Sequence, residues 1–108
     1  MSPSETHDRE MNAIDRLDRV IHEPARLKIM TYLYVVESGD FVYLMRTTGL
    51  TRGNLSFHMT KLEEAGYVEV IKEFVDRKPV TMLRLTDQGR KAFLEYRKNM
   101  RLVIEDSK

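Results

Sequence analysis

Side chains with the chemistry to bind a polyanion gather between residues 41 and 62. This stretch contains three basic residues and no Asp or Glu, although the 108-residue chain has 17 acidic residues. Arg and Lys bind phosphate, and Arg, Asn, Ser and Thr can also hydrogen-bond to base edges in the major groove of a duplex. The candidates for such contacts are Arg52, Asn54, Ser56, Phe57, Thr60 and Lys61.

The order of these residues suggests different roles. Arg52 would lie near the start of a helix, which favours a bidentate contact with guanine, whereas Thr60 and Lys61 are expected at phosphates. Phe57 could touch a thymine methyl group or pack under a neighbouring hairpin, and packing is the preferred interpretation. Gly53 costs a helix about 1 kcal/mol relative to Ala, and either permits close approach of a duplex backbone or is neutral variation. The alternative for the whole set is an ordinary solvated helix face without a ligand.

A second basic pair occurs in the turn sequence Asp76-Arg77-Lys78-Pro79. Arg77 and Lys78 could lie in or along the minor groove, whose negative potential attracts cations, or they could be part of a plain solvated turn. Arg84 is either a further contact or a strand-surface charge. His58 is expected to be half-buried and hydrogen-bonded. With no Cys and the other two His distant in sequence, we expect neither a metal site nor a cofactor.

Two short helices separated by a glycine must position these groups. Before the break Phe41, Leu44 and Met45 share one helical face, and after it Leu55, Met59 and Leu62 share another. Gly49 can end the first helix in a left-handed conformation, and the Thr51 hydroxyl can cap the second. The pattern predicts a helix-turn-helix.

The remaining elements follow from periodicity and start and stop signals. Residues 1–10 are expected to be a mobile tail, and an amphipathic helix of about three turns is expected from Met11 to Ile21. Pro24 should begin a core helix that ends at residues 38–40. Gly66 should cap the C-terminal end of the outward helix that Thr51 begins. Strands are predicted at 67–75 and 80–85 around a turn at 76–79, and Thr86-Asp87 should start the last helix.

Composition limits the class of protein. The length suits one domain, here residues 11–108, and the net charge of +1 reveals nothing about partners. No apolar run approaches the roughly 20 residues of a membrane span and no signal peptide is visible, so we expect a cytoplasmic protein without a membrane partner. No phosphate-binding glycine loop, nucleophile–base pair or metal cluster appears, so we do not expect an enzyme.

Three blocks of the sequence carry a resemblance to a known family. They are IHEPARLKIMTYL, GLTRGNLSFHMTKLEEAGYVEV and RKPVTMLRLTDQGRKAF, and together they span about residues 21–95. The chain resembles winged helix-turn-helix transcription regulators, close to the small MarR/ArsR-like group. The resemblance implies a mainly α fold with a small β-hairpin (α+β), in which residues 51–65 form the recognition helix and residues 67–85 the wing. It also implies that the terminal helices pair two subunits.

The apolar stripe of the last helix leaves a choice open, since it can pack on its own domain or against a second copy. Homodimerisation is the preferred interpretation, with a dimer surface made of Ile14, Leu17, Ile21, Phe93, Tyr96 and Met100. The expected function is that of a homodimeric regulator that binds a specific double-stranded DNA sequence. The alternatives are a winged-helix protein-interaction module that never meets DNA and a regulator that also senses a small molecule in the dimer cleft.

Overall fold

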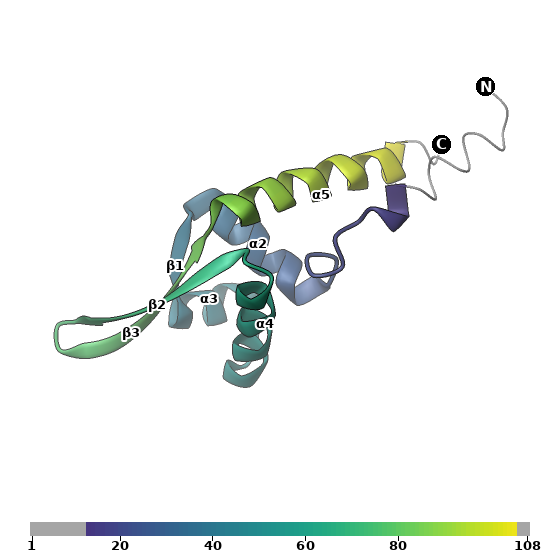
Figure 1. The fold of residues 1–108 in the computed structure, drawn as a ribbon. Helices are drawn as coiled ribbons and strands as arrows, with labels where there is room; N and C mark the ends of the chain where they lie inside the picture. The colour runs from purple at the N-terminus through teal and green to yellow at the C-terminus, as the bar shows by residue number, and fades with distance from the viewer. Residues whose placement is uncertain (1–12, 106–108) are drawn as a thin grey trace, which may run out of the picture.

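The computed structural model describes residues 13–105, and the expected tail over residues 1–10 lies outside the described residues. The helices are α2 (Pro24–Val36), α3 (Phe41–Thr48), α4 (Arg52–Glu64) and α5 (Asp87–Glu105), and the strands are β1 (Ser38–Asp40), β2 (Val68–Val75) and β3 (Lys78–Leu85). Figure 1 shows α5 running along one side of the molecule, α4 on the opposite side, and the β2–β3 hairpin projecting away from the helices. The mainly helical fold with a small sheet confirms the predicted class.

The segment before α2 differs from the expected three-turn helix. In the described part of this segment, helix continues only to Asp15, and turns follow. The Asp18 carboxylate accepts hydrogen bonds from the amides of Val20 (2.8 Å) and Ile21 (3.2 Å). Such a local side-chain turn competes with helical hydrogen bonding, so the chain bends here while Ile21 still enters the core.

Helix α2 is the central core helix, as predicted. It begins at Pro24, and Glu23 caps it by accepting a hydrogen bond from the Arg26 amide (2.8 Å). Pro suits the first helical position because its missing amide donor would have no intrahelical partner there. Ile29, Met30 and Leu33 of this helix are fully buried, so the other elements pack around it.

The segment after α2 forms a strand that sequence patterns did not predict. Residues Ser38–Asp40, expected only to end the core helix, form β1 and pair antiparallel with β3, so the sheet order is β1-β3-β2. A Ser-Gly-Asp run has no strand-forming side chains, and its conformation depends on β3 as a hydrogen-bonding partner. Gly39 packs closely against α2, since a Cβ atom there would lie 3.1 Å from the Tyr32 ring and the ring would have to shift slightly.

The hairpin turn is tighter than predicted. Only Asp76 and Arg77 form it, at φ values of 52° and 66°, whereas Lys78 and Pro79 belong to β3 and pair with Val75 and Phe74. A two-residue turn with both φ values positive matches the twist of the flanking strands. Proline is tolerated at this point because β1 pairs only with residues 82–84, which leaves the outer part of β3 with β2 alone beside it.

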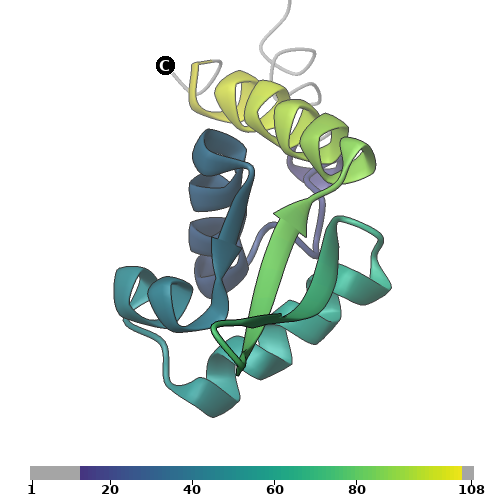
Figure 2. The ribbon, with the colours of Figure 1, turned by 90° about the vertical axis from the view of Figure 1, so that its left-hand side faces the viewer.

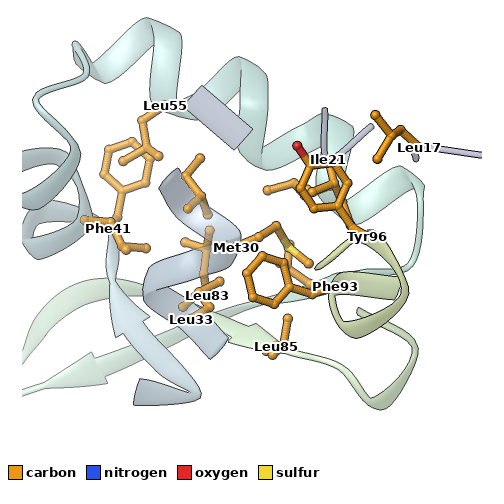
Figure 3. Close-up of a cluster of buried hydrophobic side chains, with 14 residues drawn as sticks. Leu17, Ile21, Met30, Leu33, Phe41, Leu55, Leu83, Leu85, Phe93 and Tyr96 are labelled. Atoms are coloured by element: carbon orange, nitrogen blue, oxygen red, sulfur yellow. The ribbon is translucent and has the colours of Figure 1, made fainter. Parts of the chain in front are cut away.

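The core buries four of the six residues expected at the dimer surface. Leu17, Ile21, Phe93 and Tyr96 are buried in the protomer itself, and Figure 3 shows Phe93 and Tyr96 in the same cluster as Met30. These four side chains therefore pack within their own domain, and the dimer surface stays a prediction. Of the six expected residues, only Ile14 is exposed, while Met100 is partly buried against the core.

Among the described helices, none is long and apolar enough to cross a membrane.

Candidate nucleic-acid interface

The corner between α3 and α4 has the predicted capping chemistry. Gly49 adopts φ 75° after α3, and its amide donates to the Met45 carbonyl (3.0 Å). The Thr51 hydroxyl then accepts a hydrogen bond from the Asn54 amide (3.2 Å) at the start of α4. A left-handed residue ends one helix and a hydroxyl begins the next, which confirms the predicted helix-turn-helix.

The buried side chains of α4 determine which face it presents. Leu55 and Leu62 are fully buried, and Met59 packs against the core. With these positions anchored, the polar residues between them must point outward. At the C-terminal end, Ala65 caps the helix and Gly66 follows at φ 79°, which directs the chain into β2.

Five of the six α4 candidates are exposed, and Ser56 is partly buried. The Arg52 guanidinium lies 5.5 Å from the centroid of the Phe41 ring, and the Lys61 ammonium lies 5.5 Å from that of Phe57. Thr60 donates its hydroxyl hydrogen to the Ser56 carbonyl (3.0 Å), within the helix. The fold thus gathers the candidates along one accessible helix.

Phe57 does not pack under the wing, contrary to the preferred interpretation. Its side chain is 55% exposed and meets the His58 ring edge-on, with 5.2 Å between the centroids. The reason is its position in α4, because the neighbouring core positions of the helix are occupied by Leu55 and Met59.

His58 is half-buried and hydrogen-bonded, as predicted, at a junction between α4 and the start of α2. Its Nδ1 lies 3.1 Å from Nη1 of Arg26 and 3.5 Å from a Glu23 carboxylate oxygen. Arg has no acceptor, so Nδ1 accepts from Arg26 when the ring is neutral and faces Glu23 as an ion pair when the ring is protonated. Burial acts to raise the Glu23 pKa, but the amides of Arg26 and Ala25 and the nearby positive charges outweigh it and lower that pKa.

Sequence reasoning did not identify Glu23 or Arg26 as supports of α4. Arg26 lies 32 positions from His58, and neither residue forms part of a recognisable motif with it. Their contact attaches the middle of α4 to the first turn of α2, which fixes the orientation of the exposed face.

The wing lies beside the first turn of α4. A cleft of about 160 Å³ is lined by Arg52, by Asp40 and the start of α3 at Phe41 and Val42, and by Pro79, Val80 and Thr81 of β3. In Figure 2, α4 runs along the lower edge and α5 along the upper edge, with the sheet between them. Arg77 and Lys78 are exposed at the hairpin tip, so they are separate from α4.

Arg84 lies on the strand surface and forms an ion pair with Glu69, its partner across the β2–β3 ladder.

Within residues 13–105, no group of three or more His, Cys, Asp or Glu side chains is arranged to hold a metal ion.

The chain matches known proteins over most of its length. Residues 25–104 match the winged helix DNA-binding domain family. The uncharacterized protein MJ0432 of Methanocaldococcus jannaschii is 38% identical over 78 residues, which cover 72% of this chain and 85% of that protein.

Solved structures agree with this assignment. A transcriptional regulator homologue from Pyrococcus horikoshii OT3 superposes with a TM-score of 0.81 at 30% identity, covering 89% of this chain and 94% of that one. A MarR family transcriptional regulator from Streptomyces coelicolor, solved in complex with DNA, shares the fold with a TM-score of 0.50 at 21% identity, covering 95% of this chain and 71% of that one. The family and fold are those of transcriptional regulators and not of enzymes. The chain belongs to the winged helix DNA-binding domain family, with the architecture of MarR-like regulators.

Proposed function

We propose that this chain is a transcriptional regulator that binds a specific DNA sequence as a homodimer, with α4 in the major groove and the wing on the backbone or in the minor groove. The observation that carries the proposal is the exposed face of α4, which has no acidic residue from Arg52 to Leu62 and is held by a buried stripe behind it. A single helix fits the major groove, and this face offers the donors and acceptors that base edges require.

Position along α4 supports a division of roles. Arg52 occupies the first helical position, where the free amides and dipole of a helix N-terminus also favour phosphate. Its guanidinium, held near the Phe41 ring, can reach base edges at the tip of the helix, together with Asn54. Thr60 and Lys61 lie more than one turn further along and suit backbone phosphates, as do Arg77 and Lys78 on the wing.

The dimer is proposed to form through exposed apolar residues at the free end of α5 and before α2. Leu102 and Ile104 are exposed on α5, and Ile14 is exposed on the N-terminal segment. Figure 1 shows the C-terminal half of α5 extending beyond the helix-turn-helix, near the N-terminal segment. A two-fold axis there can place two α4 helices about 34–36 Å apart, facing successive major grooves. Ile104→Glu should therefore produce monomers in analytical ultracentrifugation, whereas Glu95→Gln should leave the dimer intact.

Selection of duplexes from a random pool tests the proposal. The wild-type protein should enrich one pseudo-palindromic sequence, and Arg52→Ala should weaken its binding by about 1–3 kcal/mol while relaxing the preference at one base position. Lack of any enriched sequence, together with unchanged residual DNA affinity in Arg52→Ala, would contradict it. That result would favour the protein-interaction module, for which exposed Phe57 and Val42 are the supporting observation.

A regulator that also senses a small molecule is supported by a groove between α2 and α5. The groove measures about 450 Å³, and its lining includes apolar Leu27, Phe93 and Met100, the cations of Arg97 and Arg101, and Glu105, which pairs with Arg101. This volume and mixed lining suit an aromatic acid. A panel of aromatic carboxylates should raise the melting temperature of the wild type but not that of Arg97→Ala.

A further inference from the structure

The tip of the β2–β3 hairpin exposes large apolar side chains that phosphate contact does not explain. Phe74 is 78% exposed and Val75 is 50% exposed, and Pro79 beside them is also exposed. Figure 1 shows that this tip stands well away from the helical core, so the domain itself does not cover it. Apolar groups clustered in water mark a contact surface.

The pairing register assigns these side chains to opposite faces of the hairpin. Phe74 pairs with Pro79, and Lys72 with Thr81, in line with Val70↔Leu83 and Val68↔Leu85 further along. Directly paired residues share a face, so Phe74 and Pro79 continue the face that buries Leu83 and Leu85 against the helices. Val75 lies on the opposite face with its partner Lys78.

The face that carries Phe74 differs in charge from the opposite face. Nearer the domain both faces of β3 approach the start of α4, since Pro79, Val80 and Thr81 line the same 160 Å³ cleft as Arg52. Lys72 is the only charged residue of the two strands on this face, since Glu69 and Glu73 alternate onto the other one. The Phe74 ring therefore projects at the tip of the wing, from a strand face whose one charged residue is a lysine.

Size and charge favour nucleic acid over a protein as the occupant. A stable protein interface buries about 800 Å² on each partner, which a few side chains at a hairpin tip cannot supply. A minor groove needs only one or two apolar side chains to enter a base step, flanked by cations that hold the phosphates. Lys72 on the same face and Arg77 in the turn supply those cations near Phe74, while Lys78 belongs to the opposite face.

We infer that Phe74, supported by Pro79, is a wedge that enters the minor groove and partly unstacks one base step of the bound duplex. The inference rests on the proposed function, since it requires a DNA complex. Inserted apolar side chains kink the duplex, so the wing would read the deformability of the step it meets. Flexible pyrimidine–purine steps such as TA should be preferred under the wing, even without hydrogen bonds to their bases.

Fluorescence of 2-aminopurine can detect this unstacking. The probe would replace each adenine in turn in a duplex recovered by selection with the wild-type full chain. Wild-type protein should raise the fluorescence severalfold at one position per half-site, outside the major-groove contacts. Phe74→Ala should abolish the increase and weaken binding on the order of tenfold, while Phe74→Leu should retain part of both effects.

Val75→Ala is the matched control, because it shortens an exposed apolar side chain at the same tip but on the opposite face. It should leave fluorescence and affinity unchanged. Tight wild-type binding without a fluorescence increase at any position, or an increase that persists in Phe74→Ala, overturns the wedge while leaving the proposed function intact. Equal loss of binding in both variants, accompanied by loss of self-association, also overturns it and identifies the tip as a protein contact. Failure of the wild type to bind any duplex refutes the proposed function itself.

Discussion

Replacement of Lys61 by Ala should change the salt dependence of DNA binding by a calculable amount. The side chain is exposed on α4, and its ammonium group contacts only the exposed Phe57 ring among the interactions described above, so the substitution should hardly affect folding. Three basic residues proposed at phosphates, Lys61, Arg77 and Lys78, make about six contacts per dimer, which corresponds to a log–log salt slope of about −5 if each neutralises one phosphate.

Loss of Lys61 from both protomers removes two contacts and should reduce the slope by about 1.8. Between about 50 and about 200 mM salt this difference amounts to roughly 12-fold in relative affinity. Fluorescence anisotropy titrations with a labelled, selected duplex at four or more salt concentrations would measure both slopes.

Lys91→Ala is a suitable control, because Lys91 is an exposed lysine on α5, at the edge of the molecule opposite α4 (Figure 2). It removes the same charge and should leave the slope at its wild-type value. An equal change in both variants would show that Lys61 acts only through net charge, and an unchanged slope in Lys61→Ala would refute its assignment to a phosphate.

Three further predictions concern stability and its relation to binding. Gly53→Ala should stabilise the free protein by about 0.5–1 kcal/mol in urea unfolding, since a Cβ atom there meets nothing within 4 Å. The same substitution should weaken DNA binding if the duplex backbone passes close to α4. Unchanged DNA affinity would show that Gly53 is neutral for binding. Gly89→Ala should lower the free energy of unfolding by at least about 3 kcal/mol, because its Cβ atom would lie 2.1 Å from the Tyr67 carbonyl oxygen. The control is Ala92→Gly, one turn later in α5. It should lower the free energy of unfolding by no more than about 1 kcal/mol for helix propensity, plus the loss of one methyl group. Burial, the hydrogen bond to Asp18 and the charge of that carboxylate raise the pKa of Tyr67 from 10.0 to about 12. The stabilisation of the fold by the protonated phenol is therefore present below pH 10.0 and is lost as the pH rises through about 12. The stability difference between wild type and Tyr67→Phe should shrink over that range, and a constant difference would refute the linkage.

Elements with local signals could be predicted from the sequence. Pro24, Gly49 and Thr51 act through backbone geometry and hydrogen bonds within a few residues, so the start of α2 and the corner between α3 and α4 were predicted correctly. Strand β1 and the bend at Asp18 were not, because the first depends on a partner more than 40 positions away and the second on a side-chain turn that replaces helical bonds.

The same division applies to the candidate site. Apolar spacing was enough to predict that the helix buries Leu55 and Leu62 and leaves Arg52 and Lys61 exposed, because a helix repeats every 3.6 residues whatever surrounds it. Periodicity shows only that a stripe will be buried and not what buries it, and only the tertiary structure shows Phe93 and Tyr96 inside the core of the protomer.

The sequence by itself determined the helix-turn-helix, the polar character of α4 and the basic hairpin, since each follows from residue type and short-range spacing. Only the tertiary structure decided that His58 attaches α4 to Glu23 and Arg26, that Phe57 stays exposed, and that Phe74 shares the exposed tip of one hairpin face with Pro79. These features depend on contacts between segments distant in the chain and on the strand register, where a shift of one residue would reverse the face of every side chain.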